Sequence, residues 1–326
     1  MTRALCTLFA GLALAGLIGT ATAQNYPSAK PVTIIVPFAA GGPTDIVARQ
    51  LAQAMTKPLG ATVIVDNKPG AGGTLAAEYV AKAAPDGYTI LLHHIGMATA
   101  PALYRTLRFN PLTDYEYIGQ VVDVPMTLVA RKDFPANNLK ELIEYVKANK
   151  ATVNLANAGL GAASHLCGLL FMSTIQTELQ TIPYKGTGPA MTDLQGGQVD
   201  LLCDQTTQTT QLIQTGRVKA YGATTKTRVS SLPNLPTMAE QGLPAFEVVI
   251  WHGVYAPKGT PKPVTEKLVK ALQEAVKDPG FRASMDKLGT LPVADAAVTP
   301  EGLRTHLKAE IDKWTPIIKK AGQYAD

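Results

Sequence analysis

The pattern of hydrophobic and polar positions repeats one arrangement of elements twice along the chain. The first copy has a β-branched run at residues 31–37, a loop of small residues at 39–45 and an apolar-periodic helix to about Met55. The second copy has a short apolar strand at 153–157, followed by a glycine-rich loop and a helix to about Met172. Each copy therefore predicts a strand, a small-residue loop and a helix in the same order.

Both copies continue with a second strand, a lysine followed by spaced glycines, a further helix and a third strand after a glycine break. These strands and lysine–glycine segments are residues 63–66, 68–73 and 88–92 in the first copy, and 179–182, 185–188 and 199–202 in the second. Units of the form β-α-β-α-β build parallel sheets whose loops meet at the carboxyl ends of the strands. Two such units facing each other predict an α/β protein with two lobes and a small-molecule cleft between them.

Two long β-branched runs are expected to connect the lobes. Residues 118–130 are typical of a strand that leaves the first lobe and enters the second, and residues 246–255 of a return strand. Other helices are predicted at residues 139–147, 263–276 and 300–321, the last two packed against the first lobe. We assign residues 24–124 and 249–326 to lobe 1 and residues 125–248 to lobe 2.

The two glycine-rich loops have no adjacent lysine or arginine, but each lies at a predicted helix start. The first backbone N–H groups of a helix lack an intrahelical acceptor and carry the positive end of the helix dipole, so they favour an anion. Thr44, Asp45 and Ser164 are also suitable N-cap residues, and capping alone is the alternative interpretation. The matched loops favour anion binding, because capping does not require symmetry.

Residues 1–23 have the pattern of a secretory signal peptide. Arg3 precedes an apolar stretch at residues 4–18, and residues 21–23 form a small-x-small cleavage site. The stretch is short for a membrane span, and no second run of about 18 apolar residues follows. We expect export and removal of residues 1–23, which changes the net charge from +5 to +4 through the loss of Arg3.

Loss of Cys6 with this segment leaves two cysteines, Cys167 and Cys203, in an oxidising compartment. Cys167 lies on the helix after the second glycine-rich loop, and Cys203 ends the third strand of the same lobe. These elements can be neighbours, so we expect a disulfide, with two buried free thiols as the alternative. A bridge closing a loop of this size contributes about 3–4 kcal/mol, mainly through the unfolded state.

Composition and histidine spacing argue against nucleic acid and metal as partners. Hydrophobic residues make up 46% of the chain and charged residues 17%, below the ~25% typical of soluble domains, as expected for a compact globular protein. The slight positive charge is scattered, with no basic run interleaved with aromatic residues. The five histidines show no metal-ligand spacing, and His93 and His94 on one strand should point to opposite faces.

Patterns typical of enzymes are weak. Residues 159–164 approach the dinucleotide pattern G-x-G-x-x-G/A, but end in serine and lack an acidic residue at the expected spacing. Ser164 and His165 are helix neighbours and cannot face each other as nucleophile and base. Cys203 and Asp204 with a distant histidine would form the catalytic residues of a hydrolase, but a disulfide explains Cys203 better. Residues 284–287 match the S-x-x-K motif by chance. A secreted enzyme acting on a carboxylated substrate is thus the alternative function class, behind a binding protein.

Six ordered segments resemble the Bug family, the periplasmic receptors of tripartite tricarboxylate transporters. The segments are PVTIIVPFAAGGPTDIVARQLA, NKPGAGGTLAAEYVAKAAPDGYTILL, NAGLGAASHL, IPYKGTGPAMTDLQGGQVDLLCD, LPNLPTMAEQGLPAFEV and GVYAPKGTP. The resemblance covers essentially the whole chain after the signal peptide. It implies a type II-like periplasmic-binding-protein fold and a receptor without catalytic activity or cofactor, which delivers a small organic carboxylate to membrane permease subunits. We expect a monomer.

The resemblance also implies which residues bind the ligand. The two glycine-rich loops are expected to hold one carboxylate through Phe38, Ala40, Gly41, Gly42, Pro43 and Thr44 of lobe 1 and Ala158, Gly161, Ala163, Ser164 and His165 of lobe 2. Further contacts are expected from Gly72, Gly73, His94 and Asp204. The segments HHIGMATAPALY, ASHLCG and VDLLCDQTT are most similar to members that bind acidic amino acids such as aspartate.

Asp204 is the residue most informative about the ligand. A carboxylate at a strand end in an anion cleft repels a simple dicarboxylate and suits a ligand that also carries an ammonium group. We therefore hypothesise that Asp204 binds the α-amino group of an acidic amino acid. The alternative is that Asp204 caps a turn or pairs with a lysine. Trp251 and His252 at the predicted return strand are candidates for the hinge side of the cleft, but aromatic residues at such positions are expected in the core more often.

Overall fold

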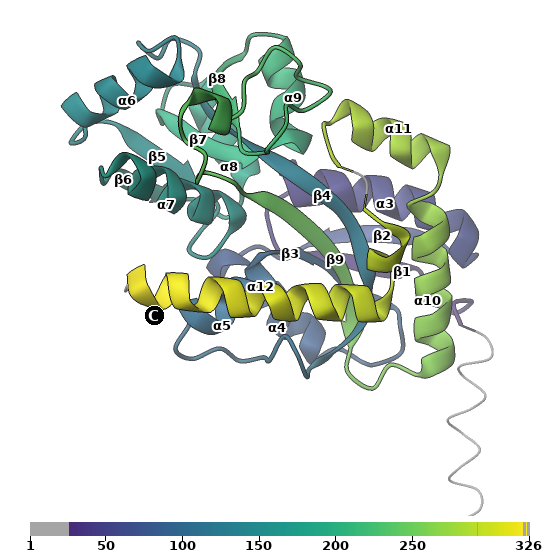
Figure 1. The fold of residues 1–326 in the computed structure, drawn as a ribbon. Coiled ribbons are helices and arrows are strands. Elements are labelled where there is room, and N and C mark those ends of the chain that lie inside the picture. Colours follow the sequence, from purple (N-terminus) through teal and green to yellow (C-terminus); the bar gives the residue numbers. More distant parts are fainter. Residues whose placement is uncertain (1–25, 292, 322–323, 325–326) are drawn as a thin grey trace, which may run out of the picture.

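The computed structural model describes residues 26–291, 293–321 and 324, so the predicted signal peptide at residues 1–23 lies outside the described chain. The protein is mixed α/β (Figure 1). Nine strands form one sheet in the order β2-β1-β3-β9-β4-β7-β5-β6, with β8 paired to β4. No helix in the described part of the chain combines the length and hydrophobicity needed to span a membrane.

The elements fall into three stretches of the chain. The first contains β1 (Val32–Val36), α3 (Pro43–Leu59), β2 (Val63–Asn67), η1 (Ala71–Gly73), α4 (Thr74–Ala81), β3 (Thr89–His94) and α5 (Gly96–Leu103). The second contains β4 (Tyr115–Arg131), α6 (Leu139–Ala148), β5 (Asn154–Asn157), α7 (Ala163–Ile175), β6 (Gln180–Pro183), α8 (Thr187–Gln195), β7 (Leu201–Gln205), α9 (Thr206–Gln214) and β8 (Val218–Ala223). The third contains η2 (Ala239–Gln241), β9 (Val249–Pro257), α10 (Lys262–Ala275), α11 (Pro279–Lys287), η3 (Asp295–Ala297) and α12 (Pro300–Ala321).

Both predicted β-α-β-α-β units are present. In lobe 1, β1 pairs in parallel with β2 and β3, and in lobe 2, β5 pairs in parallel with β6 and β7. The glycine-rich loops therefore follow β1 and β5, at the carboxyl ends of their strands. The two-lobed α/β architecture expected from the repeated pattern is confirmed.

β4 and β9 run side by side between the two groups of helices (Figure 1). β4 pairs with β9 from Tyr115 to Pro125, and from Met126 onwards it pairs with β7 and β8. The antiparallel partner of Pro125 is Val249, the first residue of β9. The change of partners supports the lobe boundaries after residues 124 and 248, which remain a proposal.

Hydrogen bonds centred on Thr224 tie the two crossing strands together. The Thr224 amide donates to the Met126 carbonyl (2.9 Å), and the Met126 amide donates to Thr224 Oγ1 (3.0 Å). Thr224 Oγ1 donates to the Val248 carbonyl (2.6 Å), and the Val248 amide donates to the Thr224 carbonyl (3.1 Å). The residue that follows β8 thus joins β4 to the residue that precedes β9.

The C-terminal helices complete lobe 1, as expected. α10 packs on α3, and α12 lies across α5 and β4 (Figure 1). Trp251 of β9 is buried, lies edge-on to the His306 ring of α12 (centroids 5.0 Å apart) and donates Nε1–H to Glu310 Oε2 (3.4 Å). Trp251 therefore belongs to the core that anchors α12.

Candidate ligand-binding site between the lobes

An enclosed cavity lies between the two glycine-rich loops. Eleven residues from both lobes line it: Phe38, Pro43, Thr44, His94, Ala158, Ala162, Ala163, Ser164, Thr187, Asp204 and Gln205. Its volume accessible to the centre of a water molecule is about 20 Å³, and about 10–15 Å³ suffices for one water. In this arrangement the lobes are therefore closed too tightly to hold a four-carbon acid without moving apart.

The buried carboxylate of Asp45 fixes the conformation of the lobe 1 loop. Gly41 has a left-handed backbone (φ 79°), and its amide donates to Asp45 Oδ2 (2.9 Å). Arg49 Nε donates to the same oxygen (2.9 Å), and Asn67 Nδ2 donates to Asp45 Oδ1 (2.9 Å). These hydrogen bonds keep the pKa of Asp45 below its usual value against the opposing effect of burial. Asp45 therefore has a structural role and faces its own loop.

The lobe 2 loop repeats this construction with a histidine. Gly161 has the same φ of 79°, and its amide donates to His165 Nδ1 (3.3 Å), again four residues ahead. The amide of Ala158 donates to Ser164 Oγ (2.8 Å). Burial lowers the pKa of His165 to about 4, so the ring is neutral at pH 7 and Nδ1 can accept. The side chain of His165 and the Ser164 hydroxyl thus shape the loop.

The two lobes touch at these loops through backbone groups and through one threonine hydroxyl. The amide of Ala39 donates to the Lys185 carbonyl (2.9 Å), and Thr99 Oγ1 donates to the Gly161 carbonyl (3.2 Å). A Cβ atom on Gly188 would lie 2.7 Å from the Ala40 carbonyl oxygen. Glycine at position 188 therefore permits the close approach of α8 to the lobe 1 loop.

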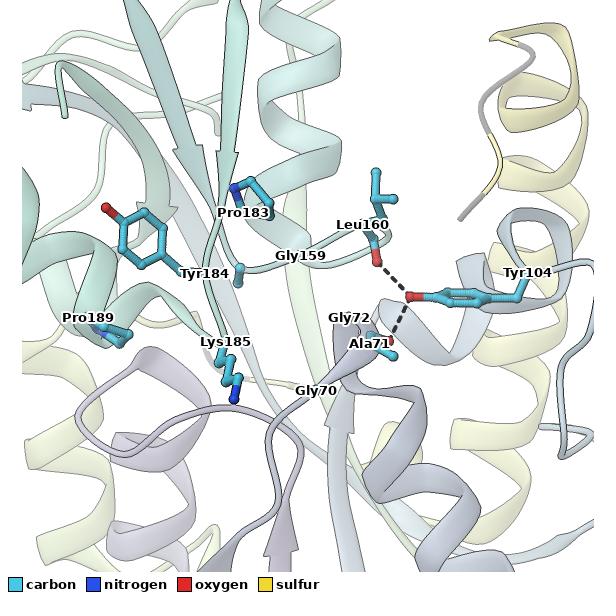
Figure 2. A pocket seen from close by; sticks show the side chains of 11 residues that line it. Gly70, Ala71, Gly72, Tyr104, Gly159, Leu160, Pro183, Tyr184, Lys185 and Pro189 are labelled. Carbon is cyan, nitrogen blue, oxygen red and sulfur yellow. Dashed lines mark hydrogen bonds between the residues drawn. The ribbon is translucent and has the colours of Figure 1, made fainter. Parts of the chain in front are cut away.

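A second, outer cavity of about 620 Å³ opens between the lobes and shares Ala158 with the enclosed one. Figure 2 shows Tyr104 at one side of it, with its hydroxyl within hydrogen-bond distance of the Ala71 carbonyl of lobe 1 (2.7 Å) and the Leu160 carbonyl of lobe 2 (3.2 Å). Gly72, with φ 59°, lies against Leu160, where a side chain would overlap the carbonyl oxygen. The lobes are therefore also in direct contact at this edge of the outer cavity.

Three buried histidines form the lobe 1 wall behind the cavity. The His94 ring stacks on Phe38 (centroids 4.7 Å apart) and meets His252 edge-on (5.7 Å). The rings of His93 and His94 lie only 5.1 Å apart, so the expectation that they point to opposite faces is wrong. His94 is the last residue of β3, and its amide turns back to donate to His93 Nδ1 (2.8 Å), which draws the rings together.

Hydrogen bonds assign the tautomer of His94. The amide of Gly96 donates to His94 Nδ1 (3.0 Å), so Nδ1 is an acceptor and the neutral ring carries its hydrogen on Nε2. Burial, with smaller effects from His93 and His252, lowers the pKa of His94 well below its usual value. Because His94 lines the cavity, it offers a neutral ring to that space. On the other side of this wall, His252 Nε2 lies 3.3 Å from Thr44 Oγ1.

Asp204 lies on the lobe 2 side of the cavity, at the end of β7. Its side chain is buried, and Oδ2 has no hydrogen-bond partner among the described residues. Burial raises the pKa of Asp204 to about 7, against smaller lowering effects of the Gln205 backbone and the Thr187 side chain. No lysine or arginine is among the residues described as lining the cavity. A buried carboxylate of this kind needs either a cation or a proton.

The buried histidines predict that the ligand-free protein loses stability in acid. Burial lowers the pKa of His93 and His165 to about 4 and that of His252 to about 3, with His94 also lowered, whereas unfolded histidine titrates near 6.5. Below pH 6.5 the unfolded chain gains protons that the folded chain does not bind, so stability falls toward pH 4. Burial raises the pKa of Asp204 to about 7 and that of Asp123 to about 6, so these two carboxyls act oppositely, but they offset only part of the effect of the four histidines.

We therefore expect a lower thermal midpoint at pH 5 than at pH 7, measured by differential scanning calorimetry of ligand-stripped protein. A His252→Asn variant that folds should show a shallower dependence. An equal midpoint at the two pH values would contradict the prediction.

The structure brings part of the predicted site to the enclosed cavity. Eight predicted residues line it: Phe38, Pro43, Thr44, His94, Ala158, Ala163, Ser164 and Asp204. The other seven lie around it: Ala40, Gly41 and Gly42 face Gly188, Gly72 lines the outer cavity, Gly73 adjoins the His93 ring, and Gly161 and His165 hold the lobe 2 loop. Binding of ligand by these residues remains a prediction.

Three lining residues, Ala162, Thr187 and Gln205, were not predicted. Thr187 lies within the lysine–glycine segment at 185–188, whose match to residues 68–73 was a usable signal. Gln205 directly follows Asp204, and only the pairing of β7 with β4 reveals that it reaches the cavity. Among the described residues, no group of three or more His, Cys, Asp or Glu side chains could hold a metal ion.

The family model described as "Tripartite tricarboxylate transporter family receptor" matches residues 47–323. This chain belongs to that family. A curated relative from Agrobacterium vitis, the UPF0065 protein in the TAR-I ttuE-ttuC' intergenic region, is 50% identical over 300 residues, covering 92% of this chain and 86% of the relative.

Two solved structures extend the comparison. The periplasmic binding protein BugD is 57% identical with a TM-score of 0.89, over 92% of this chain and 99% of BugD. MatC from Rhodopseudomonas palustris, solved with bound malate, is 38% identical with a TM-score of 0.86, over 89% and 99%. The family model is described as a receptor and BugD as a periplasmic binding protein, which confirms the expectation of a Bug-family receptor and not an enzyme.

Proposed function

We propose that this receptor captures an acidic amino acid such as aspartate between its lobes and delivers it to the permease subunits of a tripartite tricarboxylate transporter. It would act as a monomer in the periplasm after removal of residues 1–23. The observation that carries the ligand assignment is the buried, unpartnered Asp204 Oδ2 in a cavity that is also lined by the first residues of α3 and α7.

The carboxylate side of the ligand would face the starts of α3 and α7. Pro43 and Thr44 begin α3, Ala163 and Ser164 begin α7, and all four line the cavity. These helices of 17 and 13 residues direct the positive ends of their dipoles at these points, with first-turn N–H groups that lack an intrahelical acceptor from Thr44 onwards in α3, since Pro43 has no N–H, and from Ala163 onwards in α7. Converging helix starts favour an anionic group without any charged side chain.

The amino side of the ligand would face Asp204. An α-ammonium group supplies the cation that the described lining residues lack, and a charge-assisted hydrogen bond replaces a desolvated carboxylate oxygen. Pairing of Asp204 with lysine finds no support, since no lysine of the described chain forms an ion pair with it. Malate in the related MatC occupies a receptor of the same fold, and an amino group is what would distinguish aspartate from such a ligand.

The test is thermal unfolding of mature, ligand-stripped protein against a panel of amino acids, dicarboxylates and aromatic acids. A ligand that binds only the folded state stabilises it by about 2.7 kcal/mol at 100 times its dissociation constant. We expect L-aspartate or L-glutamate to raise the midpoint most at pH 8. Asp204→Asn should weaken this binding at least tenfold, because a charge-assisted bond contributes about 1.5–3 kcal/mol.

Asp286→Asn makes the same chemical change on an exposed face of α11 and serves as the control. Unchanged aspartate affinity in Asp204→Asn would exclude the ammonium contact. If no acid in the panel stabilises the protein after unfolding and refolding to remove bound ligand, the receptor proposal itself fails.

A further inference from the structure

We infer that Asp204 selects ligands by charge: the site takes an ammonium-bearing acid directly, but takes a simple dicarboxylate only together with one proton on Asp204. This inference rests on the proposed function, since it concerns the same cavity. It adds a second ligand class and the condition under which that class binds.

The geometry leaves Asp204 without a compensating charge. Its side chain is about 1% exposed, and one carboxylate oxygen has no partner in the described chain. The neighbouring positions on β4, α8 and β7 are Thr127, Thr187 and Gln205, all uncharged. Any positive charge beside Asp204 must therefore come from the ligand, or a proton must neutralise the carboxylate.

The titratable groups that face this region cannot supply the charge near neutral pH. From lobe 1, His94 lines the cavity, with His93 and His252 behind it, and from α7, His165 holds the adjacent loop. Burial lowers the pKa of each of these rings, so all four are neutral between pH 6.5 and 8.5. Cys203, next to Asp204, is bridged to Cys167 and does not titrate.

Like charges in such a space are unfavourable. A dicarboxylate brought between the lobes would place a second anion beside a carboxylate already removed from water, and both effects disfavour the ionised form of Asp204. A protonated Asp204 becomes a hydrogen-bond donor, which suits a second ligand carboxylate or a hydroxyl group. The same side chain can thus serve either ligand class, in opposite protonation states.

Linkage fixes the sign of the pH dependence for each class. Burial raises the pKa of Asp204 to about 7 in the ligand-free protein. Above that pH the protonated form becomes scarce, so dicarboxylate affinity should fall by up to tenfold per pH unit. Below it the ionised form becomes scarce, so the affinity for an ammonium-bearing acid should fall by up to tenfold per unit. The ratio of the two affinities therefore changes about tenfold per pH unit.

The experiment is isothermal titration calorimetry of the full mature protein with L-aspartate and with succinate from pH 6.5 to 8.5. Titration at pH 8 in two buffers of different ionisation enthalpy measures the protons exchanged on binding. We expect uptake of nearly one proton with succinate and almost none with aspartate. Asp204→Asn should bind succinate with a flat pH profile and no uptake, while Asp286→Asn should behave as wild type.

The outcomes separate this inference from the receptor proposal. Succinate binding with no proton uptake and constant affinity would overturn the inference and leave the receptor proposal standing. Aspartate binding without any succinate binding down to pH 6.5 would overturn it too, because protonated Asp204 would then admit no dicarboxylate. Absence of binding by every acid would remove both. The uptake measurement needs only wild-type protein, so a poorly folding variant does not block the test.

Discussion

Replacing Gly188 with valine is expected to weaken ligand binding by about a hundredfold while leaving lobe 2 folded. Gly188 is the second residue of α8, and its Cβ position lies 2.7 Å from the Ala40 carbonyl oxygen and 3.1 Å from the Gly42 amide nitrogen. Backbone atoms cannot rotate away as a side-chain end can. Overpacking of this kind costs about 1–3 kcal/mol or more. Here it destabilises only the closed state, in which α8 contacts the lobe 1 loop.

The clash should persist when the lobes part slightly to admit a ligand. The methyl groups of valine reach a further ~1.5 Å beyond Cβ, so a modest separation of α8 from the lobe 1 loop does not remove the overlap. Gly188→Ala should give a smaller loss, about tenfold. Affinity is measured by calorimetry, and closure by the change in radius of gyration on ligand addition in solution X-ray scattering.

Gly196→Ala is the matched control for this series. Gly196 ends the same helix, and its Cβ position makes an ordinary 3.4 Å contact with the Thr192 carbonyl oxygen of its own lobe. This variant should bind as tightly as wild type. Full affinity in Gly188→Val would mean that the contact between α8 and the lobe 1 loop does not form in the ligand complex.

Reduction of the Cys167–Cys203 bridge is expected to lower the free energy of unfolding by about 4 kcal/mol. The structure joins these residues of α7 and β7 across 36 positions, and chain-entropy arguments assign about that value to a loop of this length. Both side chains are fully buried, so reduction should require partial opening of lobe 2. Urea unfolding with and without reductant measures the difference.

A Cys167→Ala/Cys203→Ala variant is the control for this experiment. It carries the cost of removing two buried sulfur atoms in both conditions, so the added reductant should leave its unfolding curve unchanged. A thiol assay on denatured, unreduced wild-type protein gives a second check. Two free thiols per mature chain would show that the cysteines are not bridged.

The elements with strong periodicity were predictable, and those stabilised mainly by tertiary contacts were not. Both β-α-β-α-β units and both crossing strands follow from β-branched runs and glycine breaks. α9 and β8 were missed. The sequence of α9, TTQTTQLIQ, lacks an apolar stripe and is rich in threonine, which is a poor helix former. Its threonines are buried, and Thr206 and Thr210 donate to the carbonyls of Gly289 and Leu288 beyond α11.

In the candidate site, the positions of the loops could be predicted from the sequence better than the orientations of their side chains. The glycines and helix starts could be placed because loops follow strands in a fixed order. The hydrogen bond from Gly161 to His165, and its counterpart from Gly41 to Asp45, could not be foreseen, since each depends on a left-handed glycine four residues earlier. His93 and His94 were misjudged because strand alternation ends where β3 turns into α5.

The cluster of hydrogen bonds around Thr224 limits how the two halves of the molecule can move. Met126 and Val248 are both hydrogen-bonded to Thr224, so we expect the two crossing strands to bend together. Independent sliding or twisting of either strand would break several of these hydrogen bonds at once. We therefore expect opening to be a bending at this junction and not a sliding of one lobe past the other. A distance between a pair of labels, one on α6 and one on α10, should report that bending.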